Sequence, residues 1–222
     1  MTPPPFVTRY RACFDATWPD AAPIDRARFV VLDSETTGLN PATDRIITIG
    51  AVAVSDGEIR LDDSFAALIK IARNTSAVTV HGVTRDQALE GVDEPIALER
   101  FLDYLRDGII VGHHIGHDIA TLDAAYSRHW SMTLANRSLD TMDLTLHLER
   151  DGAFAGRPPI KQFTLDALCG MFGVIPHDRH TATGDAFITA QVFLRLLRLA
   201  KRFGRDTLAG VAEPFPVPEG ES

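Results

Sequence analysis

The sequence has few cysteines and no long apolar run. Among its 222 residues, Cys13 and Cys169 are the only cysteines and form no CxxC pair, which argues against a disulfide framework or a zinc ribbon. The longest apolar stretch, 46–54, has nine residues, far fewer than the roughly 20 needed to span a bilayer. No apolar run of signal-peptide length lies near the N-terminus. We therefore expect a reduced, cytoplasmic protein without a membrane segment.

Basic charge is also scarce. Lys and Arg total 22 against 30 Asp and Glu, which gives a formal net charge of −8. A protein that grips duplex nucleic acid usually carries a basic surface, so the charge argues against a high-affinity duplex binder. It leaves room for an enzyme that acts on chain ends, because such an enzyme needs few phosphate contacts and bound cations reverse the field at a carboxylate site.

The composition is that of one soluble globular domain, with 45% apolar and 23% charged residues. Five prolines among small residues predict an N-terminal arm over residues 1–24. The proline- and acid-rich end predicts a flexible tail over residues 205–222. The domain itself is expected between them, over residues 25–204.

Hydrophobic periodicity predicts an α/β domain. Short apolar, β-branched runs and turn signals indicate strands at 29–32, 45–54, about 58–71, 108–111 and near 139–140. Apolar spacing of three and four residues and end signals indicate helices at 93–106, through 118–126, around 140–150 and 162–172, and through 187–197, where Phe187, Ala190, Phe193, Leu194 and Leu197 share one face. A three-strand antiparallel meander followed by alternating helix and strand predicts a mixed sheet flanked by helices.

Two acids mark the end of the first predicted strand. Asp33 and Glu35 follow a buried apolar run and precede Thr36-Thr37-Gly38-Leu39. Residues two apart in a strand point to the same face, so the two carboxylates converge. Paired buried carboxylates are costly unless a cation lies between them, and Mg²⁺ prefers such oxygen ligands. The pattern favours a metal site over two solvated acids.

Two later clusters follow the same logic. Asp118 lies where the fourth strand gives way to a helix, and a helix N-terminus favours negative charge. Asp185 opens the last long helix, and His180 precedes it on a loop. Four carboxylates suit a pair of divalent ions that clamp the attacking and leaving oxygens of a displacement. The histidine, with an ordinary pKa of about 6.5, suits removal of a proton from the attacking water.

These residues resemble the motifs of the DEDDh branch of the 3′–5′ exonucleases, which includes the proofreading subunit of bacterial DNA polymerase III. Residues 32–39, Leu-Asp-Ser-Glu-Thr-Thr-Gly-Leu, match the first motif, Asp118 matches the second, and His180 with Asp185 matches the third. His81-Gly82-Val83-Thr84 and Asp140-Thr141 resemble further family segments, so the resemblance spans about residues 28–200.

The resemblance implies a ribonuclease-H-like fold and a set of roles. Asp33, Glu35, Asp118 and Asp185 would bind two divalent cations, Mg²⁺ or Mn²⁺, with His180 as the general base. The 3′-terminal nucleotide would lie against Thr36, Thr37, Gly38 and Leu39, with His81 lining the cleft. The implied substrate is the 3′ end of single-stranded DNA, with RNA second, and the implied partner is a polymerase or repair subunit.

The second motif departs from the family pattern HNxxFD. His114 stands in place of the Asn and His117 in place of the Phe, which changes packing beneath the metal site. For His113, His114 and His117 a structural role is favoured over metal binding. His117-Asp118 could also be the dyad of an HD-type phosphohydrolase, although that class is all-helical. A non-catalytic docking module of a polymerase or repair complex is the alternative of a different class.

Other polar residues are interpreted more simply. Asp140 and Asp143 begin a helix, where acids cap the N-terminus. Several basic residues could contact phosphates, but solvated surface charge is the favoured interpretation for each of them: Arg73, Arg85, Arg157, Lys161 and Arg179.

Overall fold

The structure is a computed structural model that describes residues 3–16, 18–70, 91–156 and 162–214. Its strands are β1 (Phe29–Thr36), β2 (Ile46–Ser55), β3 (Glu58–Leu68), β4 (Ile109–Gly112) and β5 (Ser138–Asp140). They form one sheet in the order β3-β2-β1-β4-β5. β2 is antiparallel to β1 and β3, whereas β4 is parallel to β1 and β5 to β4. The predicted mixed five-stranded sheet is confirmed.

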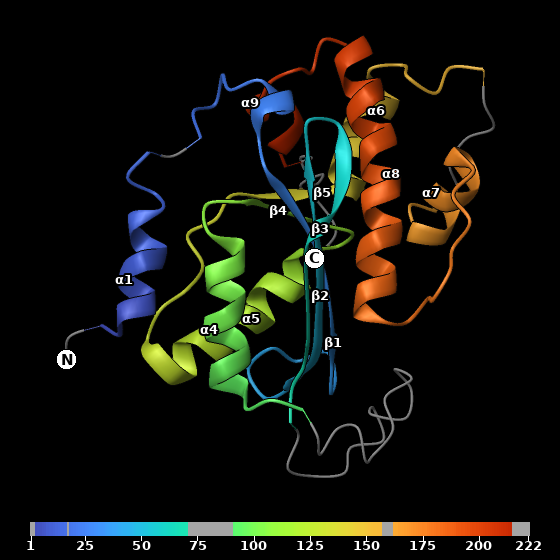
Figure 1. Ribbon diagram of the computed structural model, residues 1–222. Coiled ribbons are helices and arrows are strands. Elements are labelled where there is room, and N and C mark those ends of the chain that lie inside the picture. The colour runs from blue at the N-terminus through green and yellow to red at the C-terminus, as the bar shows by residue number, and fades with distance from the viewer. Residues whose placement is uncertain (1–2, 17, 71–90, 157–161, 215–222) are drawn as a thin grey trace, which may run out of the picture.

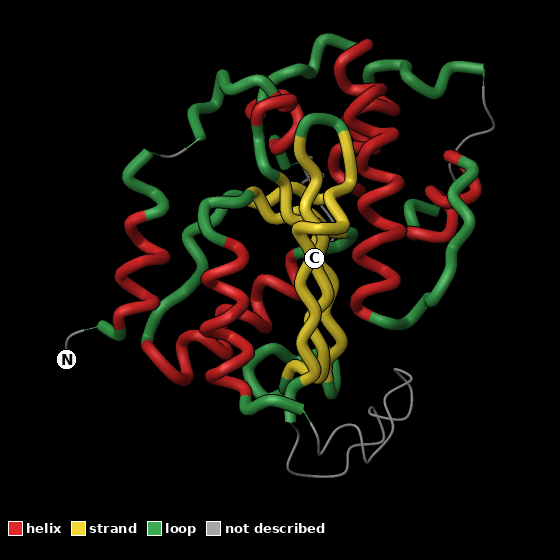
Figure 2. The backbone as a smooth tube through the Cα atoms, viewed as in Figure 1, coloured by secondary structure: helices red, strands yellow, loops and turns green. Residues whose placement is uncertain are grey.

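Helices cover both faces of the sheet (Figure 1). One face carries α1 (Pro5–Ala12), α4 (Glu94–Leu105) and α5 (Gly116–Trp130). The other carries α6 (Thr141–Arg150), α7 (Leu165–Phe172) and the long α8 (Ala182–Arg202). The short η1 (Ile24–Arg26) and α9 (Leu208–Ala212) complete the described elements. Figure 2 shows the strands enclosed between these two helical layers. Among the described residues, no helix is long and apolar enough to cross a membrane.

The alternation of side chains along β1 divides the core into two parts. Phe29 and Val31 face α8, whereas Val30 and Leu32 face α4 and α5. Phe29 meets Phe193 of α8 edge to face, with ring centroids 5.0 Å apart. Because the period of a strand is two residues, the next positions on the α8 side are those of the two acids in the first motif. The core therefore aims these acids toward α8.

The N-terminal residues differ from the expected arm, because residues 5–12 form α1. Phe6, Val7 and Tyr10 are buried, and the helix is fastened to α4 by paired hydrogen bonds from Arg9 to Asp103. Proline at the first helical position leaves no backbone donor unsatisfied and presets φ. The prolines that suggested an arm therefore begin a packed helix.

The C-terminal residues also begin with ordered structure. Within the expected tail, α9 buries Leu208 and Val211 against β5 and the α8 side of the core. Gly204 has a left-handed φ of +77° two residues after the end of α8, a conformation that glycine often supplies at helix ends. On α8 itself Ala190, Phe193 and Leu197 are buried, but Phe187 is 39% exposed. Because Asp185 points inward and residues two apart on a helix point in different directions, the Phe187 side chain points toward solvent.

Candidate active site

The pairing of β1 with β2 fixes where the first two acids point. Asp33 lies opposite Gly50 and Glu35 lies opposite Thr48 in the antiparallel register. Cross-strand partners share a face of the sheet, so both carboxylates stand on the α8 side. This confirms that the two acids of the first motif converge.

Gly50 allows α8 to approach the sheet at this point. A Cβ atom at Gly50 would lie 2.3 Å from the carbonyl carbon of Ala182 and 2.4 Å from the amide nitrogen of Thr183. The backbone of the first turn of α8 thus rests directly on β2, beside Asp33. This contact carries Asp185, in the same turn, to the carboxylates of β1. Sequence reasoning missed Gly50, because nothing local marks a contact between residues so distant along the chain.

Three carboxylates meet at this junction. One carboxylate oxygen from each of Asp33, Glu35 and Asp185 lies within 4.8 Å of the other two. Burial raises the pKa of Asp33 to about 9, and the charges of Asp118, Asp185 and Glu35 add to the rise. Burial, followed by the charge of Asp185, likewise raises the pKa of Glu35 to about 7. The cluster is therefore electrostatically unfavourable by itself, and a cation would relieve it.

Asp118 approaches the cluster from the other side of β1. It is buried in the first turn of α5, and its Oδ1 accepts hydrogen bonds from the backbone nitrogen of Ser34 at 2.9 Å and from Ser34 Oγ at 2.6 Å. Asp118 does not belong to the group of three mutually close carboxylates. Its burial raises the pKa of its carboxyl. Ser34, between the two acids of β1, fixes Asp118. The sequence offered no signal for this contact.

His180 stands on the loop that leads into α8. Its backbone nitrogen donates to Asp185 Oδ2 at 3.1 Å, its φ is +64°, and the residue is exposed. Its charge is near enough to Glu35 to oppose the rise in the pKa of that carboxyl. The structure therefore places His180 beside the carboxylate cluster and open to solvent.

Arg179 is the clearest correction to the sequence interpretation. It was expected to be a solvated surface charge, but its guanidinium pairs with Asp185 and with Asp166 of α7, and its side chain is only 23% exposed. The spacing of six residues between Arg179 and Asp185 gave no helical or strand signal. The turn that reverses the chain before α8 brings them together.

The Thr36–Leu39 turn is built around an acid that the sequence analysis did not single out. Asp44 accepts a hydrogen bond from Thr37 Oγ1 at 2.9 Å, and a Cβ atom at Gly38 would lie 2.7 Å from the Asp44 carboxylate. Thr36 Oγ1 donates to the Gly38 carbonyl at 2.7 Å. Leu39 is left 86% exposed at the tip. The turn is therefore closed internally and offers an apolar side chain outward.

The histidines of the second motif lie beside Asp140. The Asp140 carboxylate caps α6 through Met142, as expected, and also accepts from the backbone nitrogens of His114 and Ile115. His114 has φ +59°, a left-handed conformation that Asn adopts readily and that also occurs for His. The Asn of the family pattern therefore suits a left-handed backbone conformation at this position, and His114 adopts that conformation.

His113 plays a structural part at the same place. Its Nδ1 lies 3.0 Å from Thr141 Oγ1, and burial lowers its pKa to about 4. Within the described part of the chain, the histidines 113, 114 and 117 join no group of three metal-binding side chains. The mixed sheet also excludes the all-helical HD scaffold. His81 and the basic residues Arg73, Arg85, Arg157 and Lys161 lie outside the described residues.

Comparison with known proteins identifies the family. Residues 30–193 match the family model RNase T, which is described as an exonuclease, and the chain belongs to this exonuclease family. It is 34% identical over 191 residues to a PolC-type DNA polymerase III of Thermotoga petrophila, covering 84% of this chain and 13% of the polymerase. The corresponding Bacillus subtilis polymerase is 31% identical over 184 residues, with 82% and 12% coverage. The chain thus spans about an eighth of these relatives.

Solved structures show the same fold. E. coli exonuclease I in complex with a dT13 oligonucleotide aligns with a TM-score of 0.68 at 19% identity, covering 81% of this chain and 43% of that one. A zinc-bound complex of the same enzyme with single-stranded DNA aligns with a TM-score of 0.63 at 20% identity, covering 80% and 41%. The fold agrees with the ribonuclease-H-like expectation.

We expect Gly50→Ala to reduce exonuclease activity about 100-fold, because a misplacement of about 1 Å at a reacting centre costs that much. The added methyl group cannot fit against the backbone of α8, so the turn that bears Asp185 must shift. Overpacking should also lower the free energy of unfolding by about 1–3 kcal/mol. Initial rates and urea unfolding measure the two effects.

The matched control is Gly170→Ala. Gly170 lies within α7, and a Cβ atom there meets no atom within 4 Å beyond its chain neighbours and the helix's own backbone. This variant should keep native activity. Native rates in the Gly50 variant would show that the close approach of α8 to β2 is not needed for the site.

Proposed function

We propose that this protein is a metal-dependent 3′–5′ exonuclease that removes nucleoside 5′-monophosphates from single-stranded DNA. The observation that carries the proposal is the meeting of Asp33, Glu35 and Asp185 within 4.8 Å of one another, with His180 exposed beside them. Membership of the exonuclease family supports the same reaction. The activity proposed here is that of this chain, which corresponds to a small part of the polymerases it matches.

The donor set suits hard divalent cations. The three close carboxylates offer only oxygen, the ligand type that Mg²⁺ and Mn²⁺ prefer, and their mutual repulsion raises the pKa values of Asp33 and Glu35 beyond the effect of burial. We propose that these residues, together with Asp118, hold two such ions. When bound, the ions would supply Lewis-acid stabilisation of the charge that develops on the phosphate and the leaving oxygen.

The protein's own groups supply the proton transfer. His180 takes a proton from the attacking water as the water oxygen bonds to the terminal phosphorus. The bond between phosphorus and the 3′ oxygen of the penultimate nucleotide breaks, that oxygen takes a proton from solvent water, and His180 releases its proton to solvent. The hydrogen bond from the His180 backbone nitrogen to Asp185 Oδ2 keeps the backbone of this residue beside the carboxylate cluster.

We propose that the terminal nucleotide binds against the Thr36–Leu39 turn. Leu39, three residues after the end of β1, is 86% exposed, and an exposed apolar side chain there can stack against a base or sugar. DNA is the preferred substrate in this proposal, because the relatives are named as DNA polymerases and exonuclease I was solved with single-stranded DNA.

A polymerase is the proposed partner. The matching relatives carry the corresponding segment within the polymerase chain itself, and in this proposal the exonuclease domain acts beside a polymerase in the same way. The alternative is a docking module without catalysis. Retention of all four acids and His180 favours the enzyme.

The decisive test uses single-stranded DNA and RNA labelled at either end, incubated with Mg²⁺, Mn²⁺ or chelator. We expect metal-dependent shortening from the 3′ end, faster on DNA, and release of nucleoside 5′-monophosphates. A 3′-blocked strand should persist, and Asp33→Ala should abolish shortening of every strand.

Two outcomes would contradict the proposal. Efficient cutting of a circular single strand would show an endonuclease. No shortening under any condition, by a folded chain, would favour the docking module.

A further inference from the structure

One guanidinium links the beginnings of two helices at the active site. Arg179 Nε donates to Asp166 Oδ1 at 2.9 Å, and its Nη1 donates to Asp185 Oδ1. Asp166 lies in the first turn of α7 and Asp185 in the first turn of α8. Arg179 is therefore shared between one acid of the carboxylate cluster and one acid outside it.

The two acids differ in their surroundings. The Asp185 side chain is 9% exposed, whereas that of Asp166 is 65% exposed. An ion pair strengthens as water is excluded, so the contact with Asp185 is the stronger half of the bridge. The positive charge of Arg179 also opposes the rise in pKa at Asp33 and Glu35. Arg179 thus supplies part of the cationic charge that the cluster needs.

A divalent ion would compete for the same carboxylate. An ion held by Asp33, Glu35 and Asp185 needs an oxygen of Asp185, and its charge repels a guanidinium in contact with that residue. We propose that Arg179 is a positioning residue that competes with the divalent cation for Asp185 and thereby sets the affinity of the site. Asp166 is the anchor that keeps Arg179 near the site when it leaves Asp185. This inference rests on the cation site proposed above.

The competition predicts opposite effects for the two ends of the bridge. Arg179→Gln removes the competitor, so Mn²⁺ should bind about fivefold more tightly, equivalent to about 1 kcal/mol. Asp166→Asn removes the alternative anchor, so Arg179 stays on Asp185 and Mn²⁺ should bind about threefold more weakly. Because Asp166 acts through Arg179, Asp166→Asn should have almost no effect once Arg179→Gln is present.

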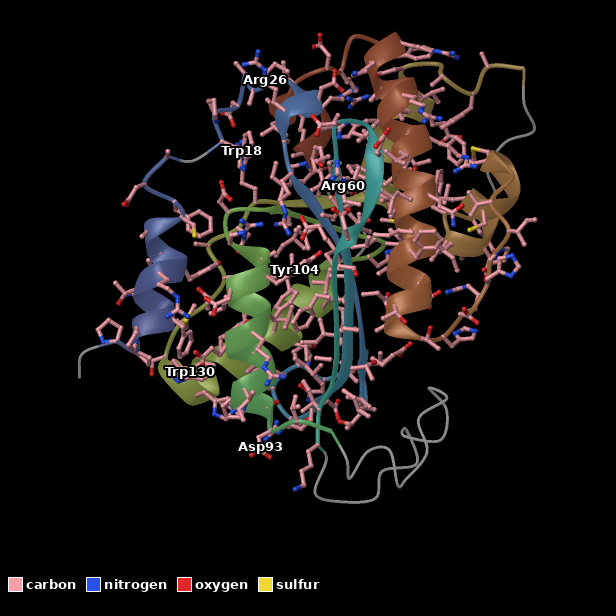
Figure 3. The ribbon with its side chains drawn as sticks, viewed as in Figure 1. Trp18, Arg26, Arg60, Asp93, Tyr104 and Trp130 are labelled. Carbon is pink, nitrogen blue, oxygen red and sulfur yellow. The ribbon has the colours of Figure 1, made fainter. Side chains whose placement is uncertain are left out.

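The experiment is a titration of the full chain with Mn²⁺ alone, followed by the electron paramagnetic resonance signal of the free ion. It needs no nucleic acid and no turnover. Arg60→Gln is the matched control, because it removes the same charge from an exposed pair with Asp62 on β3. Arg60 is labelled in Figure 3 on the β2–β3 hairpin, at the end of the sheet where α8 finishes.

The expected result is tighter binding by Arg179→Gln, weaker binding by Asp166→Asn, and native affinity for Arg60→Gln. Equal or weaker binding by Arg179→Gln, or an undiminished effect of Asp166→Asn in the double variant, would overturn this inference alone. Absence of Mn²⁺ binding by the native chain would overturn the cation site and this inference together.

Discussion

Replacement of Asp33 by asparagine should lower the exonuclease rate on the order of a thousandfold, because cation stabilisation of the transition state amounts to several kcal/mol and each 1.36 kcal/mol is a factor of ten. Asparagine keeps the size of the side chain but removes the charge shared by the whole cluster. Single-turnover rates with saturating Mg²⁺ measure the loss. The same variant should bind Mn²⁺ much more weakly than the native chain.

Asp33→Asn should also stabilise the metal-free protein. Burial and neighbouring acids raise the pKa of Asp33 to about 9 in the folded state, whereas an unfolded chain ionises it near pH 4, at about 3.9. The unfolded chain therefore loses its proton first, and the native protein loses stability as pH rises from about 4 to about 9. Asparagine removes this dependence, so the variant should melt higher in chelator at pH 8.

The pH series is its own control. At pH 4 the native and Asp33→Asn chains should melt at similar temperatures in chelator, and the gap should widen as pH rises. Each kcal/mol corresponds to roughly 2–4 °C for a chain of this size. Added Mg²⁺ should raise the melting temperature of the native chain more than that of the variant. A variant that melts below the native chain at pH 8 would contradict the electrostatic origin of the effect.

Replacement of His180 by alanine should lower the maximal rate about 10²–10⁴-fold, the usual contribution of a positioned general base. The affinity for Mn²⁺ should change little, because the side chain provides a base and the contact with Asp185 comes from its backbone. Rates at saturating substrate and metal titration together separate these effects.

His129→Ala is the matched control for His180. This histidine lies on α5 and pairs with Glu94, away from the carboxylate cluster. It should retain native turnover. Full activity in His180→Ala would refute the general-base role, and a parallel loss of metal affinity would indicate a ligand instead.

The sequence predicts the elements and the acids well, because each depends on local patterns. The apolar run before Asp33 marks a buried strand, and the helix that begins near Asp185 follows from its apolar spacing. What it misses is set by tertiary contacts: the approach of α8 to Gly50, the bond from Ser34 to Asp118, and the pairing of Arg179 with two acids across a turn. No periodic pattern encodes a partner that is far along the chain or that a turn brings close.

The N-terminus shows the opposite error. Local composition suggested an arm, because proline usually interrupts regular structure. Tyr10 lies three residues after Val7 and four after Phe6, so the three side chains share one face of the helix. This face packs against α4 and α5. Proline at a helix start is compatible with both outcomes, and only the tertiary surface decides between them.

The contact between Phe29 and Phe193 ties the precision of the site to the packing of the core. Phe29 begins β1, which ends in the acids of the first motif, and Phe193 lies two turns beyond Asp185, about 12 Å along α8. The two elements that carry the carboxylates are thus clamped together by aromatic rings that never approach a substrate. Repacking of these core residues is therefore expected to slow the reaction while leaving every residue of the site in place.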